Sequence, residues 1–326
     1  MKKLAARRMT PSAGPLVANP AFLVGSERSG TTLLRLMLNQ HPRISFHFEF
    51  EFAVELVRED GSLPDLAAFH DYLADHRIFQ LSGACVDPGL DFRQLLNSFL
   101  VQHRGDRDSS VLGATVHQSF DRLPFLWPQG RYVHLIRDGR DVSLSIVAMG
   151  WAGNTWCAID RWLEAERTWE NLCRRVPAER RLDVYYEKLI ADPEHTLTEV
   201  CRFLDLDFDA AMLTYPQHST YELPDPSKIG QWRNTPPQQV RRAEAKACAT
   251  LLAHGYELSG APAKYPSFVT SIGLRLHDKW RRAMFRIKRY GLGLVLASAI
   301  ARKLGPKSLA RLVSKRISDI DNRNLR

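Results

Sequence analysis

The chain has 326 residues, of which 44% are hydrophobic and 25% are charged, so its composition allows a packed core and excludes wholesale disorder. The formal net charge is +9, but the segment from Gly273 onward contains 15 Lys and Arg residues and only three acids. The excess positive charge therefore lies in the tail, and it does not predict nucleic-acid binding by the body. We expect a cytoplasmic protein, because no apolar run reaches the ~18 residues of a membrane span, the N-terminus lacks the apolar segment of a secretory signal, and five scattered cysteines form no CxxC pair.

The predicted elements fall into three segments in chain order. Residues 1–20 predict a flexible basic arm with Pro and Gly. Residues 21–265 alternate short apolar runs with helical patterns, which is typical of an α/β domain with a P-loop-like parallel sheet flanked by helices. We expect strands at 21–25, 111–116, 131–136 and 181–186, and helices at 30–40, 139–149, 158–173 and 193–204.

The third segment, 266–326, is a basic helical tail. From Gly273 onward, Leu276, Trp280, Met284 and Ile287 recur at helical spacing with Arg and Lys between them. Such a basic amphipathic helix can lie on an anionic membrane surface. It can equally pack on its own body or on a partner subunit, and the sequence leaves both possibilities open.

The segment "FLVGSERSGTTLLR" (22–35) predicts a strand, a loop rich in small residues, and a helix that begins near Gly30. Backbone N–H groups at such a turn bind phosphate, helped by the helix dipole. The spacing from Gly25 to Gly30 matches GxxxxG of a P-loop, but Thr31 stands in place of its Lys, and the strong cation is Arg28. The loop suits one phosphate and a neighbouring anion better than a magnesium-bound triphosphate.

A second motif, "YVHLIRDGRDVSLSI" (132–146), places Arg137 at the end of a strand and Ser145 eight residues later, about two turns into the following helix. An Arg and a Ser so placed can hold one phosphate, the Arg by a forked charge-assisted contact. The two motifs together indicate a site for two phosphate groups.

The first motif, "RSGTTLLRLMLNQHP", resembles the 5′-phosphosulfate loop of sulfotransferases that use 3′-phosphoadenosine 5′-phosphosulfate (PAPS), and is similar to that of the protein-tyrosine sulfotransferases and their bacterial relatives. Glu27 stands where that family usually has Pro. The resemblance implies PAPS as donor, 3′-phosphoadenosine 5′-phosphate (PAP) as product, and no required metal. It also implies that Arg137 and Ser145 hold the 3′-phosphate, and that the 5′-phosphosulfate is held by Arg28, Ser29, Gly30, Thr31 and Thr32.

Two weaker segments extend the resemblance to about residues 21–260. "DVYYEKLIADPE" (183–194) is similar to a family segment whose second Tyr, here Tyr186, contacts the adenine. "SKIGQWRN" (227–234) is similar to the segment that closes over the 3′-phosphate, with Lys228 as its candidate ligand. On sequence alone Tyr186 fits a buried strand residue equally well.

The base candidates lie in "ISFHFEFEF" (44–52). In a strand, His47, Glu49 and Glu51 would share one face, and the Phe residues the other. A carboxylate among Phe rings can have a raised pKa and act as a general base. The resemblance implies a Glu base 21 residues after the loop Arg, which is Glu49; Glu51 and His47 are the alternates.

The chain departs from its relatives in one respect. They carry a Lys shortly before the second motif, which assists charge development on the leaving group. The corresponding stretch here, "LGATVHQSFD" (112–121), has no Lys; Thr115 lies near that position and His117 follows. Either His117 supplies the donor or Arg28 acts alone.

The sequence gives less information about the acceptor substrate. Trp151 and Trp156, with Asn154, are candidates to line an acceptor pocket, whereas Trp162 fits helix core. A peptide, carbohydrate, lipid or small-molecule acceptor with a hydroxyl or amine remains open, with peripheral membrane contact through the tail.

We therefore predict a PAPS-dependent sulfotransferase with Glu49, Arg28 and His117 as its catalytic residues. Two other functions stay open. A P-loop nucleotide or small-molecule kinase would explain the first loop but lacks the loop Lys. A non-catalytic, membrane-associated nucleotide-binding protein would keep the phosphate site without needing a base.

Overall fold

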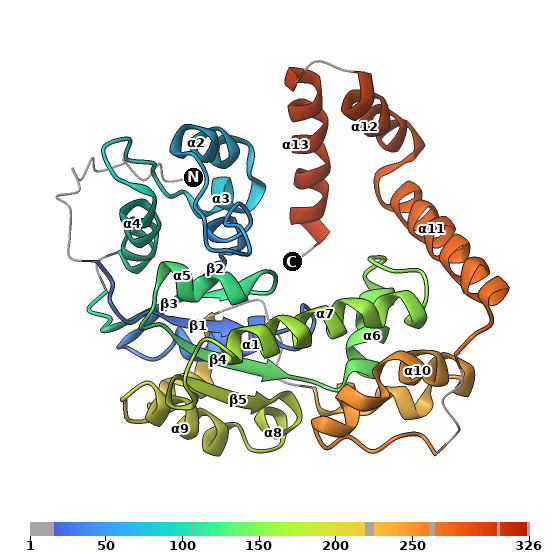
Figure 1. Cartoon of the computed structure of the whole chain (residues 1–326), viewed down its shortest axis with the longest axis horizontal. Coiled ribbons are helices and arrows are strands. Elements are labelled where there is room, and N and C mark those ends of the chain that lie inside the picture. Colours follow the sequence, from blue (N-terminus) through green and yellow to red (C-terminus); the bar gives the residue numbers. More distant parts are fainter. Residues whose placement is uncertain (1–15, 106, 219–224, 261–264, 305–306, 325–326) are drawn as a thin grey trace.

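A five-stranded parallel sheet organises the body of the protein (Figure 1). The computed structural model describes residues 16–105, 107–218, 225–260, 265–304 and 307–324. The strand order is β2-β3-β1-β4-β5, so the central strand β1 lies between two later strands. The strands are β1 (Ala21–Val24), β2 (Ile44–Glu49), β3 (Val111–Val116), β4 (Arg131–Ile136) and β5 (Arg181–Tyr185).

Helices cover both faces of the sheet (Figure 1). One face packs against α1 (Thr31–Leu38), α8 (Tyr186–Ala191) and α9 (Pro193–Phe203). The other packs against α4 (Phe92–Arg104), α5 (Leu123–Leu126) and α7 (Thr155–Cys173). The remaining helices are α2 (Leu66–Asp75), α3 (Arg77–Ser82), α6 (Gly139–Ala148), α10 (Pro237–Ala253), α11 (Phe268–Tyr290), α12 (Leu292–Leu304) and α13 (Lys307–Asn324).

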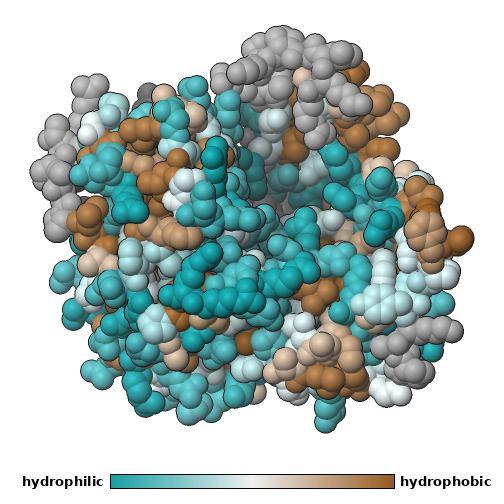
Figure 2. Space-filling model, in the orientation of Figure 1, coloured by the Kyte–Doolittle hydropathy of each residue, from teal (hydrophilic) through white to brown (hydrophobic). Residues whose placement is uncertain are grey.

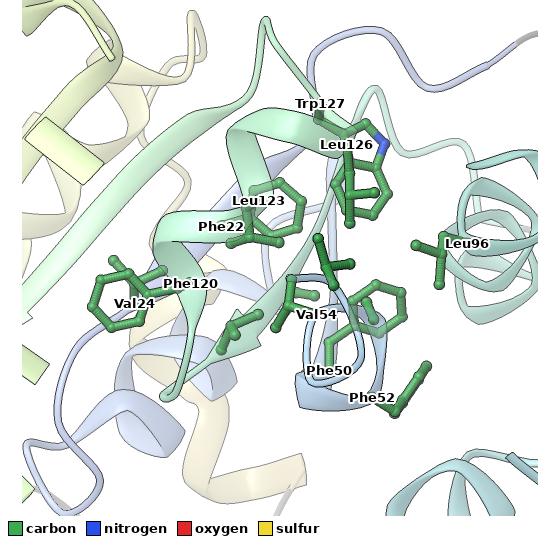
Figure 3. Packing of buried hydrophobic residues seen from close by; sticks show 14 of the residues in the cluster. Phe22, Val24, Phe50, Phe52, Val54, Leu96, Phe120, Leu123, Leu126 and Trp127 are labelled. Atoms are coloured by element: carbon green, nitrogen blue, oxygen red, sulfur yellow. The ribbon is translucent and has the colours of Figure 1, made fainter. Parts of the chain in front are cut away.

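The central strand shows why the sequence folds this way. Side chains alternate across a strand, and β1 is apolar on both sides. Phe22 and Val24 enter the cluster against α4 and α7, whereas Ala21 and Leu23 enter the cluster against α1 and α9. Figure 3 shows the first cluster, in which Phe22 lies near Trp127, their ring centroids 5.1 Å apart. Burial on both faces fixes the strand in the centre of the sheet.

The predicted strands and helices match the structure closely, with small differences at their ends. Both 111–116 and 131–136 are strands over the predicted ranges. The helix expected from 158 begins at Thr155, because the Asn154 side chain caps it by accepting a hydrogen bond from the backbone N–H of Cys157 (3.0 Å). Of the predicted arm, residues 1–15 lie outside the described residues, and the Val17 N–H donates to the Asn97 side chain (2.9 Å).

The prediction that 44–52 forms one alternating strand is wrong. The pairing with β3 shifts between His47 and Glu49, and the strand ends at Glu49. Glu51 begins a short 3-10 turn, η1 (Glu51–Ala53), so its carboxylate is not on the strand face that carries His47. The irregular register and the turn break the period of two on which that prediction rested.

The tail consists of three consecutive helices: α11 and α12 lie at the right and upper right of Figure 1, and α13 runs back at its upper centre. Near its middle, α11 docks on the loop between α6 and α7, where the Gly153 N–H donates to the Asp278 carboxylate (2.6 Å). Within the described part of the chain, none of the helices combines the length and apolar character that a bilayer crossing requires.

Candidate active site

The predicted site residues gather at the carboxyl edge of the sheet. In open α/β sheets ligands bind at this edge, where strand order reverses. Each strand ends next to one of the predicted residues or loops: the 25–30 loop follows β1, Glu49 ends β2, His117 follows β3, Arg137 follows β4 and Tyr186 follows β5. Residues separated by more than 150 positions in sequence therefore share one site.

The loop after β1 contains two residues with positive φ angles. Arg28 (φ 70°) and Gly30 (φ 99°) both have left-handed backbone angles. The Ser29 N–H donates to the Ser26 carbonyl (3.1 Å), which closes the turn. A Cβ atom added to Gly30 would lie 2.5 Å from Cδ2 of Tyr186, so that ring packs directly against the loop.

Replacing Gly30 by Ala is therefore expected to lower the free energy of unfolding by about 1–3 kcal/mol, from left-handed strain and displacement of the Tyr186 ring. Denaturant unfolding measures the change. Gly83→Ala is the matched control, because Gly83 also has a left-handed φ (69°) but its added Cβ would meet nothing within 4 Å. Equal losses in the two variants would contradict the contact with Tyr186.

The two phosphate motifs meet through direct contacts. The Arg28 Nε donates to Ser145 Oγ (3.0 Å), across 117 positions of sequence. One terminal nitrogen of Arg137 donates to the carbonyl of Arg28 (3.1 Å). The structure thus brings together the loop Arg, the second Arg and the Ser that the sequence assigned to two separate phosphates.

Two buried polar atoms of the residues predicted to hold phosphate find no hydrogen-bond partner among the described residues. They are the hydroxyl of Ser29 and the Nε of Arg137. A buried donor without a partner is costly, at about 1–3 kcal/mol, unless a ligand or water satisfies it. Their chemistry, one hydroxyl and one guanidinium N–H, fits phosphate oxygens.

The segment after residue 225 is held against the second motif mainly by its backbone. Arg137 donates to the carbonyl of Lys228 (2.8 Å), and the Asp141 carboxylate accepts from the backbone N–H of Gly230 (2.7 Å) and Trp232 (2.9 Å). The Lys228 ammonium lies 3.6 Å from the Asp225 carboxylate, and both side chains are exposed. The structure thus leaves the Lys228 side chain in solvent while its backbone meets Arg137.

Sequence reasoning missed Asp141. Its position in "GRD" of the second motif gave a signal, but the two N–H groups that it anchors lie 89 and 91 residues away. The sequence around Asp141 and the sequence around Gly230 contain no signal that these residues form hydrogen bonds with each other.

Tyr186 is buried at the back of the site, 6% exposed, with the Arg137 guanidinium 4.4 Å above its ring centroid. The ring therefore supports both Gly30 and Arg137. Its contact with an adenine stays a prediction.

A second cluster joins the end of β3 to the loop. The Glu51 carboxylate accepts from the backbone N–H of His117 (2.9 Å) and from its ring Nδ1 (2.8 Å). The other ring nitrogen, Nε2, lies 2.9 Å from the hydroxyl of Thr31. His117 thus reaches the loop position where a P-loop would carry its Lys. Glu51, an alternate base in the sequence interpretation, instead orients this imidazole.

The electrostatics of this cluster favour an ion pair. Burial works against the charged form of His117, but the hydrogen bond and charge of Glu51 raise the pKa of the imidazole above its usual value. Burial likewise opposes ionisation of Glu51, and the His117 contacts hold the pKa of that carboxyl below its usual range. A proton held on His117 would place a positive charge next to the loop, where Thr31 supplies none.

Glu49 ends β2 beside Thr115 of β3, and its side chain is exposed at the edge of the sheet. Desolvation by the surrounding protein, and then the charge of Glu51, raise the pKa of Glu49, whereas the charge of His117 opposes this. A carboxylate that is accessible and has a raised pKa suits proton abstraction near neutral pH.

His47, the other alternate base, is turned into the core. It is 1% exposed, and its ring lies against Phe50 and His103, with centroids 5.1 and 4.7 Å away. Desolvation lowers the pKa of His47 to about 4, which keeps the ring neutral. Its burial separates it from the exposed edge where Glu49 lies.

The predicted aromatic pocket divides among different environments. Trp156 lies in the first turn of α7 and is 6% exposed. Its side chain packs with Leu274 of α11. The Asn154 amide donates to the carbonyl of Leu274 (2.8 Å) and so holds the tail. Trp162 is fully buried, as expected for helix core. Of the predicted set, Trp151 stays half-buried, 5.5 Å from the guanidinium of Arg161.

Glu27, which replaces the family's Pro, fixes the loop from outside. Its carboxylate pairs with Arg161 of α7 (2.6 Å) and accepts from the Gln118 amide (3.2 Å). Glu27 thus ties the loop to α7 and to the residue after His117.

The chain is similar in sequence and in fold to known proteins. A family profile described as "Sulfotransferase family" matches residues 20–210. Protein-tyrosine sulfotransferase A of Caenorhabditis elegans is 24% identical over 267 residues, which cover 75% of this chain and 69% of that protein. Protein-tyrosine sulfotransferase 1 of Danio rerio is 24% identical over 278 residues, covering 75% and 74%. The match to the Drosophila melanogaster protein-tyrosine sulfotransferase spans 40% of that protein.

Among solved structures, the sulfotransferase domain from the curacin biosynthetic pathway superposes with a TM-score of 0.51 at 18% identity, covering 74% of this chain and 98% of that domain. That similarity shows a shared fold, the parallel sheet flanked by helices. Because the family profile covers more than half of its length, the chain belongs to the sulfotransferase family of enzymes.

Proposed function

We propose that this enzyme transfers a sulfuryl group from PAPS to a hydroxyl or amine acceptor. The observation that carries the proposal is the junction of the two phosphate motifs, where Arg28 contacts Ser145 and Arg137 contacts the Arg28 backbone. The cationic side chains of Arg28 and Arg137 and the hydroxyls of Ser29 and Ser145 lie close together there. The Ser29 hydroxyl and the Arg137 Nε are buried donors without a hydrogen-bond partner among the described residues. PAPS, when bound, supplies the sulfuryl group and a phosphate leaving group.

We assign the binding roles by motif. The 25–32 loop, including Ser29, Gly30, Thr31 and Thr32, holds the 5′-phosphosulfate through backbone N–H groups and hydroxyls. Arg137 and Ser145 hold the 3′-phosphate, and Arg28, which touches both motifs, joins the two. The fixed donors are in place before the reaction, so little reorganisation is needed.

The chemical roles fall to three residues. Glu49 takes the proton from the acceptor as its oxygen or nitrogen forms the new bond to sulfur. His117, protonated and held by Glu51, donates to the leaving phosphate oxygen as its bond to sulfur breaks. In this proposal His117 performs the role that a Lys performs in the relatives.

Replacing Arg137 by Ala is expected to weaken PAP binding about 10–100-fold, because a charge-assisted hydrogen bond contributes about 1.5–3 kcal/mol. Calorimetric titration with PAP measures this. Arg131→Ala is a suitable control, because Arg131 begins β4 at the opposite edge of the sheet and pairs with Asp205. Unchanged PAP affinity in Arg137→Ala would contradict its assignment to the 3′-phosphate.

The competing kinase function makes the opposite prediction about nucleotide choice. We expect micromolar binding of PAP without added metal and weak binding of ATP with magnesium in the same calorimetric experiment. A preference for magnesium-ATP would overturn the proposal and favour a P-loop kinase. Tight PAP binding without turnover on any acceptor would favour the non-catalytic nucleotide-binding alternative.

The acceptor remains to be identified by assay. The similar animal proteins are named for protein tyrosine, so a tyrosine peptide is the first acceptor to test. Carbohydrate, lipid and small phenolic acceptors complete the panel. Sulfation of the tyrosine peptide alone would assign the peptide class, and sulfation of another member would move the assignment to that class.

A further inference from the structure

The tail helix α11 has two faces with different environments. Its inner face carries Leu274 and Asp278, both under 9% exposed, and Phe285, whose ring lies against Gly150. Its outer face carries large apolar side chains at four-residue spacing that remain exposed: Phe268 (81%), Ile272 (43%), Leu276 (61%), Trp280 (59%) and Met284 (46%). Docking on the body therefore buries apolar side chains on one face of α11 and leaves those on the other face exposed.

The apolar series continues into the next helix. Leu292, Leu296 and Ile300 of α12 repeat the same spacing and are each more than half exposed. In Figure 2, hydrophobic side chains gather along the right edge of the molecule, over α11 and α12. Contiguous exposed apolar surface of this kind marks an interaction site. We call the eight residues from Phe268 to Ile300 the outer stripe.

The charges beside the outer stripe have one sign. Arg275, Lys279 and Arg282 of α11 are exposed, and Arg282 also lies 3.5 Å from the Asp278 carboxylate. The helix contains one acid, Asp278, and that carboxylate is on the inner face, where it accepts from the Gly153 N–H (2.6 Å). The outer surface of α11 thus combines exposed apolar side chains with Lys and Arg and carries no acid.

We propose that the outer stripe docks the enzyme on an anionic membrane surface. A helix with an apolar face, a Trp and flanking basic residues lies in the interfacial plane of a bilayer, its apolar side chains among the acyl chains and its charges at the anionic headgroups. The docked inner face holds α11 in place on the body, so the stripe is presented without further folding.

Charge complementarity favours this occupant over a second copy of the chain. A symmetric dimer formed through the outer stripe would place the same surface on both sides of the interface. The Arg and Lys side chains of the two copies would then oppose one another, with no acid on α11's outer face to offset them. Anionic lipid headgroups supply the missing negative charge.

The test is flotation of the full chain with phosphatidylcholine vesicles that contain phosphatidylserine, and with pure phosphatidylcholine vesicles. We expect binding that depends on phosphatidylserine and weakens at high salt. Substituting Leu276→Glu and Trp280→Glu together should reduce binding at least about tenfold. Lys279→Gln should reduce it roughly fivefold, the loss expected for one basic residue at an anionic surface.

Leu81→Glu is the matched control, because Leu81 is 50% exposed on α3, outside the outer stripe, and its substitution should leave flotation unchanged. Thermal unfolding and PAP binding of each variant check that the body is intact. No phosphatidylserine-dependent flotation, or equal loss in Leu81→Glu, would overturn the proposal. A dimer that forms without vesicles, and dissociates on Leu276→Glu, would assign the stripe to a second copy instead.

Discussion

Replacing Glu49 by Gln is expected to lower turnover about 10²–10⁴-fold, the range that a positioned general base contributes. The amide keeps the size of the side chain but cannot accept the acceptor's proton. Glu49 lies at the exposed edge of the sheet, outside the Arg28, Ser145 and Arg137 contacts, so PAP affinity should change little. Steady-state kinetics with calorimetric PAP titration separates the two effects.

The pH profile gives an independent test of Glu49. Its pKa is raised by desolvation and by Glu51, and the ionised carboxylate is the active form. Activity of the unmodified enzyme should therefore increase as pH rises through that raised pKa. In Glu49→Gln the dependence on this group should disappear.

Glu179→Gln serves as the control, since Glu179 lies in the exposed η3 turn (Ala178–Arg180), before β5. It should leave both turnover and PAP affinity unchanged. If Glu49→Gln retained full turnover, the base would have to be another group. If it lost PAP affinity together with turnover, Glu49 would belong to the donor site.

The local parts of the fold were predictable because their signals are local. The mainly apolar segments 111–116 and 131–136 are strands over their predicted ranges, since burial on two faces favours apolar residues at most positions. The segment 44–52 was predicted incorrectly because it contains a register shift against β3. A shift of that kind depends on the partner strand, which the sequence of 44–52 does not contain.

The candidate site shows the same division. The two phosphate motifs each follow a strand, so their meeting at one edge follows from parallel topology. The pairing of Glu51 with His117 could not be read from either residue, because it depends on the turn that removes Glu51 from β2. The sequence therefore indicated both residues as candidates, Glu51 as an alternate base and His117 as a donor, but not the hydrogen bond that joins them.

The tail illustrates a third case, in which the structure decides between two interpretations of the sequence for one face of a helix only. Helical periodicity predicted an amphipathic helix that either packs on the body or meets a membrane. The contacts of Asp278 and Phe285 show packing of the inner face. Apolar residues occur all around α11, and only the folded body shows which of them are already covered.

Replacing His117 by Ala is expected to lower turnover about 10²–10⁴-fold, because the donor to the leaving phosphate is removed. The more informative variant is His117→Lys, which restores the kind of cation that the relatives carry nearby. If His117 acts as a cation, Lys should recover part of the activity lost in Ala. If it acts as the proton-accepting base, a charged Lys should not.

The pH dependence distinguishes these roles further. The Glu51 contacts raise the pKa of His117, so the imidazolium persists until pH rises through that raised pKa, and activity should then fall. With Lys at 117, whose usual pKa is about 10.4, this fall should move to higher pH. Glu51→Gln should move it to lower pH, since the carboxylate that stabilises the imidazolium is gone. Activity that instead rises through the His117 pKa would make the neutral imidazole the active form and assign the base to His117 in place of Glu49.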